Sequence, residues 1–233
     1  MLRIALAVGA GIVALAFSMS TFERWLERHR RHELAWSVAL AMFVVAAGAL
    51  AVGAASGWNG ATFRLFYLFG AVLDVPFLAL GTVYLVAGPR QGDRWAGVVA
   101  LAGAFAAGVI VTAPFTHALP RHELAQGSAV FGVLPRVLAA VASGGGATVI
   151  VGGALWSAVR SRQRRVVISN VLIAGGTLLL GASGLFNSIG DAMTAFAVAL
   201  LLGIAVLFSG FLVAATAPVE RAKRRPTHLR RVG

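Results

Sequence analysis

Asp74 is the only charged residue in the apolar stretch LFYLFGAVLDVPFLALG, residues 65–81. The nearest formally charged residues along the chain are Arg64 and Arg90. A charged side chain at the centre of a membrane helix costs about 2.5–3.5 kcal/mol, and burial disfavours the charged form of an acid. Asp74 must therefore be protonated, paired or next to water, which makes it a candidate for binding a proton or a small ligand.

The residues around Asp74 favour a site over a surface that faces lipid. Tyr67 and Gly70 share its helix face, and small residues on that face suit a helix contact or the wall of a cavity. Pro76 cannot donate a backbone hydrogen bond to the carbonyl of Val72 and tends to kink the helix. An acid beside a broken helix at mid-membrane is common in transporter sites. We therefore assign Asp74, Pro76 and Tyr67 as candidate ligand-binding or proton-binding residues.

No basic residue is predicted at the depth of Asp74. Arg64 lies about 15 Å away along the helix axis, too far for a direct pair. Arg136 begins the fifth predicted span, and Asn187 and Asp191 flank the tight loop before the seventh. With Arg64, these three residues predict an outer vestibule. The alternative for Asp74 is a neutral carboxyl that is hydrogen-bonded to a backbone carbonyl, such as one released by the nearby proline.

Other motifs that suggest chemistry lack the partners that the chemistry needs. The segment GASG at 181–184 matches the pattern of rhomboid proteases, but activation of Ser183 requires a base within the membrane. The histidines all fall in predicted loops or in the tail, at positions His29, His32, His117, His122 and His228. This also disfavours haem, and Lys223, the only lysine, lies beyond the last span and cannot hold retinal. His117, His122 and Glu123 match no strong metal-binding spacing, so we predict no enzyme activity, cofactor or metal.

Composition predicts the fold class. The chain of 233 residues is 59% hydrophobic and 12% charged, whereas soluble domains carry about 25% charged residues. Apolar segments of about 20 residues recur, which indicates an all-α polytopic membrane protein. Seven transmembrane helices are predicted at residues 2–20, 34–57, 62–87, 95–114, 136–158, 166–186 and 191–217. They form one transmembrane domain, 1–217, followed by a basic tail, 218–233.

The basic residues predict the orientation of these spans. The loops after the first, third and fifth spans, together with the tail, contain 16 of the 20 Lys and Arg residues. The positive-inside rule then places the N-terminus outside and the C-terminus in the cytoplasm of a plasma (inner) membrane. Residues 2–20 also resemble a secretory signal, but its cleavage would place those basic residues outside. Tryptophans near the predicted span ends fit interfacial anchors, and they are Trp25, Trp36, Trp58, Trp95 and Trp156.

The net charge of +12 follows from these loops, so we expect no nucleic-acid partner. The basic tail suits anionic lipid headgroups, which attract such segments by about 1 kcal/mol per basic residue, or serves only as a topology anchor. A homo-oligomer is left open by the sequence.

An internal similarity links the first and fifth spans. The first begins LRIALAV and the fifth begins PRVLAAV, and basic loops follow both. This pattern is compatible with a 3+1+3 parallel repeat, as in some transporters, or with chance, because such features are common in membrane helices. The plan is similar to that of SWEET sugar transporters, without their proline–glutamine motifs. Through FRLFYLFGAVLDVPFLALGTVYLVAG the chain also resembles uncharacterised Ala/Gly-rich seven-helix membrane proteins of high-GC bacteria, a likeness that implies no activity.

Two functions from different classes fit these observations. The first is a small-solute or proton-coupled transporter with Asp74 as the binding or coupling group, which predicts a cavity that reaches Asp74. The second is a sensor or accessory subunit that binds a lipid, an apolar ligand or a partner protein, which predicts a dry, closed bundle around Asp74. The sequence favours transport narrowly.

Overall fold

The computed structural model describes residues 1–120, 123, 125–161, 163–182 and 192–215. The helices, in chain order, are α1 (Leu2–Arg28), α2 (Arg31–Ser56), α3 (Gly60–Phe66), the π-helix η1 (Tyr67–Leu73), α4 (Asp74–Ala87), α5 (Pro89–Thr112), α6 (Gly127–Val130), α7 (Val133–Arg160), α8 (Arg164–Ala182) and α9 (Ala192–Ala215). Helices α3, η1 and α4 follow one another without a break and cross the bundle once, so seven helical segments are long and apolar enough to span a membrane. This confirms the predicted all-helical architecture with seven spans.

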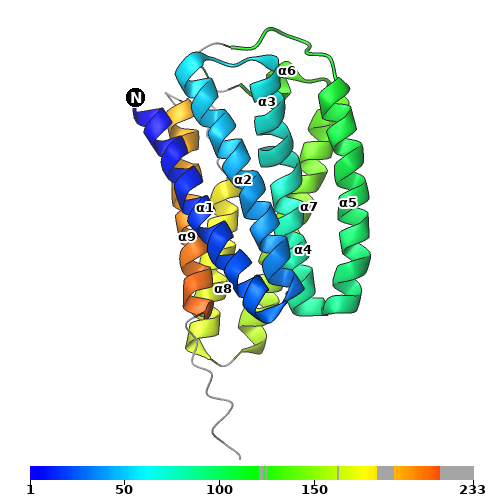
Figure 1. Cartoon of the computed structure of the whole chain (residues 1–233), viewed down its shortest axis with the longest axis vertical. Coiled ribbons are helices and arrows are strands. Elements are labelled where there is room, and N and C mark those ends of the chain that lie inside the picture. The colour runs from blue at the N-terminus through cyan, green and yellow to red at the C-terminus, as the bar shows by residue number, and fades with distance from the viewer. Residues whose placement is uncertain (121–122, 124, 162, 183–191, 216–233) are drawn as a thin grey trace, which may run out of the picture.

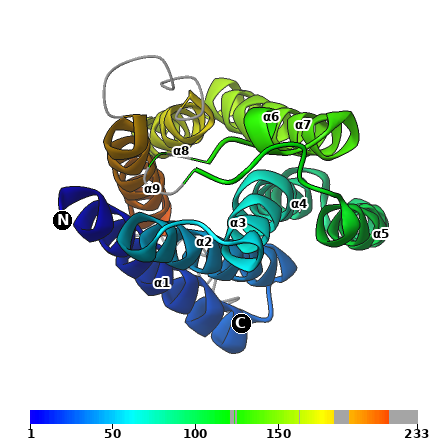
Figure 2. The same ribbon diagram turned by 90° about the horizontal axis from the view of Figure 1, so that it is seen from above.

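The spans are arranged as a ring with one helix outside it (Figures 1 and 2). Around the ring, α1 packs on α2, α2 on α4, α4 on α7, α7 on α8, α8 on α9, and α9 on α1. Helix α5 lies outside and packs mainly on α4. The first three spans thus form one side of the ring and the last three form the other. This arrangement does not test the internal repeat, which stays a prediction.

The bundle has two chemically different ends. We name the lower end in Figure 1, where α1 ends and α2 and α5 begin, the basic end, because it carries Arg28, Arg31, Arg90 and Arg160. We name the opposite end the loop end, because the long segment 113–132 joins α5 to α7 there. Neither end is assigned to a side of a membrane by the helices alone.

Local chemistry explains where several helices begin and end. Helix α1 continues past the predicted limit at residue 20 and ends at Arg28. The next residue, His29, adopts the left-handed conformation (φ 50°) and donates its N–H to Trp25 O at 2.7 Å. Helix α3 begins after Asn59, whose side chain accepts a hydrogen bond from the N–H of Thr62. Helix α5 begins with Pro89, at a position where a missing N–H costs nothing.

Two tryptophans differ from the prediction that they anchor the chain at a membrane interface. Trp36 and Trp58 are buried, and their indole N–H groups donate to Leu78 O at 3.1 Å and to Glu123 O at 3.0 Å. A buried indole needs such an acceptor, whereas an interfacial one can use water. Trp95 and Trp156 are more than half exposed, as interfacial anchors would be.

Candidate functional site: a buried carboxylate on a central cavity

The span that carries Asp74 is not a regular α-helix. Residues Tyr67–Leu73 form the π-helix η1, and the N–H of Asp74 donates to Phe69 O, five residues earlier. A π-helical turn is wider than an α-helical turn, is rare, and is frequent at functional sites. The sequence predicted a kink at Pro76; the distortion takes the form of a π-helix that ends just before it.

A serine from another helix binds a carbonyl of the π-helix, close to Pro76. In the five-residue register, Ala71 O would accept from the N–H of residue 76, but Pro76 has none. Ser143 of α7 donates its hydroxyl to Ala71 O instead, at 2.6 Å. This hydrogen bond joins the two sides of the ring at the point where the π-helix gives way to α4.

Asp74 itself is buried and not fully paired. Its side chain is on the inner face of the ring, the residue is only 5% exposed, and Oδ1 has no hydrogen-bond partner in the described part of the chain. The sequence offered a neutral carboxyl bonded to the carbonyl released by proline as an alternative. In the α-helical register that carbonyl is Val72 O, whereas the carbonyl that Ser143 binds is Ala71 O, one residue earlier. A buried polar atom without a partner is costly and requires an explanation.

Asp74 lines a cavity of about 350 Å³ at the centre of the ring. Small residues, among them Ala46, Ala47, Gly70 and Ala147, leave this space between the two sides of the ring. Every ring helix except α1 contributes to its wall. Among the described residues that line it, Asp74 is the only one with an ionisable acidic or basic group other than the tyrosine hydroxyl.

Aromatic packing closes the cavity toward the basic end. The lining residues nearest the basic end include Leu78 and Leu207. They belong to a buried cluster with Trp36 and Phe211. The rings of Trp36 and Phe211 are in edge contact, with centroids 4.5 Å apart. Gly81 permits this floor, because a Cβ atom there would lie 2.2 Å from the indole nitrogen of Trp36.

The other end of the cavity is bounded by the segment that links α5 and α7. Ala125, Gln126, Gly127 and Ser128 line the cavity, and Ser128 is exposed at the surface. The ring of Tyr67 lies against Gly127, where a Cβ atom would be 2.2 Å from the tyrosine ring. The cavity therefore extends from Asp74 to a surface segment at the loop end.

The structure separates the other candidate residues. Tyr67 lines the cavity with Asp74, but Pro76 lines a second, apolar groove of about 390 Å³ between α4, α5 and α7. Pro76 thus shapes the helix and does not face the cavity that Asp74 lines. No group of three or more metal-binding side chains occurs among the described residues.

The predicted outer vestibule is not assembled by the residues that can be described. Arg64 stabilises the end of α5: it donates to Val111 O at 3.1 Å and to Ala113 O at 2.7 Å, and its guanidinium lies 4.1 Å from the centre of the Phe115 ring. Arg136 is exposed, and neither arginine lines the cavity. Asn187 and Asp191 lie outside the described residues.

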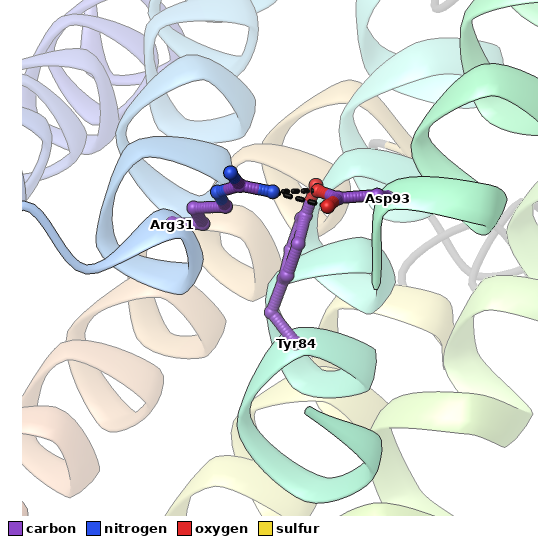
Figure 3. Close-up of polar contacts among 3 residues, drawn as sticks. All are labelled: Arg31, Tyr84 and Asp93. Carbon is purple, nitrogen blue, oxygen red and sulfur yellow. Dashed lines mark hydrogen bonds and ion pairs between the residues drawn. The ribbon is translucent and has the colours of Figure 1, made fainter. Parts of the chain in front are cut away.

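A second polar site at the basic end was missed by sequence reasoning. Arg31 of α2 forms an ion pair with Asp93 of α5, and the hydroxyl of Tyr84 in α4 donates to Asp93 Oδ1 at 2.9 Å (Figure 3). The three side chains join the starts of α2 and α5 to the end of α4. Asp93 lies between Arg90 and Arg94, so the sequence indicated only a basic loop.

In comparisons with known proteins, no family model, no curated protein and no solved structure matches the chain. The similarity to SWEET transporters and to Ala/Gly-rich bacterial membrane proteins therefore stays a prediction from topology and composition. In the described part of the chain, seven helices are long and apolar enough to cross a membrane, and this establishes the class.

Proposed function

We propose that the protein is a small-solute transporter of a plasma membrane in which Asp74 binds the solute, a coupling proton, or each in turn. The observation that carries this proposal is the buried, unpartnered Oδ1 of Asp74 on a cavity that reaches the loop end. A bundle that only had to be stable would gain by replacing such a group with an apolar side chain.

The proposed orientation has the loop end outside and the basic end in the cytoplasm, following the positive-inside rule. The cavity then extends from Asp74 toward the outside. Toward the cytoplasm, the aromatic floor around Trp36 and the cluster of Arg31, Tyr84 and Asp93 hold the helices together. A transport cycle requires these contacts to separate while the loop end closes, because the site must face one side at a time.

The helix geometry around Asp74 supports such a change. The π-helix places a break in regular hydrogen bonding at the centre of the span. The hydroxyl of Ser143 ties it to the opposite half of the ring through Ala71 O. The alternative role, a sensor or accessory subunit, predicts a closed interior around Asp74, and the observed cavity favours transport over it.

Cysteine accessibility tests the transport cycle, and the natural chain contains no cysteine that would interfere. Ala147→Cys places a thiol in the cavity wall, and Ala39→Cys places one in the packed core as the matched control. A membrane-impermeant maleimide is applied to spheroplasts and to inverted vesicles. We expect Ala147→Cys to react from both faces and Ala39→Cys from neither. Reaction from one face only would show a binding pocket without a transport cycle, and would refute the proposal.

A further inference from the structure

We propose that the central cavity selects a small lipophilic organic cation, with the positive group against Asp74 and the apolar part against the aromatic wall. This inference rests on the proposed transport site and names its solute class. It differs from the transport proposal in that it makes a claim about binding alone.

The cavity has an acidic group, Asp74, and no basic group among its described lining residues. An ionised carboxylate in a low-dielectric interior needs a compensating charge, and Oδ1 of Asp74 has no partner among the described residues. No Lys, Arg or His is among the described residues that line the cavity. The counter-charge must therefore come from a proton or from a cationic ligand. An anionic solute would face an uncompensated carboxylate at short range and would be rejected.

The wall of the cavity is rich in aromatic side chains. Four aromatic side chains line it from α2, α3, η1 and α9, namely Phe43, Phe66, Tyr67 and Phe196. Phe66 and Phe196 meet across the ring with their centroids 5.9 Å apart in an edge-on arrangement. Aromatic faces attract cations, and aromatic cages with few polar groups are the usual recognition site for alkylammonium ligands.

The remaining lining groups argue against an inorganic ion. The hydroxyls of Ser143 and Thr177 donate their protons to Ala71 O and Ile173 O and offer a ligand only neutral oxygens. A hard metal cation needs about six or more oxygen ligands, and the charged oxygens that line the cavity come from a single carboxylate. A volume of about 350 Å³ falls within the range of small-molecule sites, which suits an amine that carries one aromatic ring.

Direct binding measurements test the inference with two small probes of opposite charge. Purified full-length protein in nanodiscs is titrated with benzyltrimethylammonium, a permanent cation, and with benzenesulfonate, an anion of similar size. We expect the cation to bind and the anion not to bind. Equal binding of both probes, or binding of neither, would overturn the proposal, because charge would then play no part in selection.

Variants locate the binding site. We expect Asp74→Asn to weaken binding of the cation by about ten- to a hundredfold, the usual range for loss of a charged partner. Phe196→Leu keeps the acid and should weaken binding by about two- to thirtyfold through loss of the cation–π contact. Glu27→Gln, an exposed acid on α1, and Phe105→Leu, an exposed ring on α5, are the matched controls and should bind as the unmodified protein does. Unchanged affinity in both Asp74→Asn and Phe196→Leu would refute the site.

The two proposals fail in different ways. Loss of cation selectivity with two-sided labelling of Ala147→Cys would refute the solute class and leave transport standing. Selective cation binding with one-sided labelling would leave the binding site standing and refute the transport cycle.

Discussion

The two described aspartates, Asp74 and Asp93, differ in burial and in hydrogen bonding. Asp74 lies at the centre of a span, is 5% exposed, and has a carboxylate oxygen without a partner. Asp93 lies at the basic end with half of its side chain exposed, and its carboxylate receives both Arg31 and the hydroxyl of Tyr84 (Figure 3). Protein groups satisfy both oxygens of the exposed acid, although water could serve it, whereas Oδ1 of the buried acid has no partner among the described residues.

This contrast separates a structural role from a functional one. The cluster around Asp93 connects three helices and leaves none of its carboxylate unused. Oδ1 of Asp74 has no donor among the described residues, so an apolar residue at this position would stabilise the closed bundle more. An unpaired acid on a cavity is the arrangement expected where an incoming solute or proton supplies the missing partner.

The largest expected effect comes from Asp74→Leu, which should raise the stability of the bundle while it removes function. Loss of a buried, unsatisfied polar group is worth about 1–3 kcal/mol, and leucine also fills part of the cavity. We expect a higher Tm in detergent and no binding of benzyltrimethylammonium.

Thr177→Val is the control for Asp74→Leu, because it makes the same cavity wall more apolar without removing the acid. Its hydroxyl donates within its own helix to Ile173 O, so the Tm should change little. If Asp74→Leu lowered the Tm instead, both oxygens of the Asp74 carboxyl would have hydrogen-bond partners in the folded protein. That result would contradict the difference drawn between Asp74 and Asp93.

A smaller effect is expected at the link between Ser143 and the π-helix. Ser143→Ala leaves Ala71 O without its donor at a place where Pro76 cannot replace it, which should cost about 1 kcal/mol. Adding Pro76→Ala restores a backbone N–H, so the double variant should recover part of the lost stability. Thermal unfolding of the single and double variants measures this coupling.

Ser209→Ala is the matched control for the serine link, because Ser209 is exposed and bonds only within its own helix, to Ala205 O. Its unfolding temperature should stay close to that of the unmodified protein. A cost for Ser143→Ala that is the same with and without Pro76 would show that the two residues act independently, contrary to the register argument.

The architecture could be predicted from the sequence because it depends on segment length and apolar content. Spans of about 20 apolar residues need no tertiary information to be recognised. The limits of the helices were less predictable, since α1 continues to Arg28 through polar residues that do not break a helix. The ring arrangement and the peripheral place of α5 follow from side-chain packing between helices, which no periodicity in one segment reveals.

The candidate site was predictable only where its signal is local. Asp74 is conspicuous because a charge within an apolar run is rare, and Pro76 signals a break in the same helix. The partner of that break, Ser143, lies 72 residues away in sequence and has no distinguishing pattern. The burial of Glu33 was not predicted either. This residue is 6% exposed, and its Oε2 has no partner among the described residues. In the sequence it is surrounded by basic residues, a pattern typical of an acid at the surface.

The smallest expected effect is that of Asp93→Asn, and its dependence on salt sharpens the comparison. The side chains of Arg31 and Asp93 are both about half exposed, so salt screens their attraction, whereas a buried group is screened much less. At low ionic strength Asp93→Asn should lower the Tm slightly, and the difference from the unmodified protein should vanish near 1 M salt. The Tm difference of Asp74→Leu should persist over the same range. A deficit in Asp93→Asn that survives 1 M salt would show that screening does not govern this ion pair, and would contradict the contrast with Asp74.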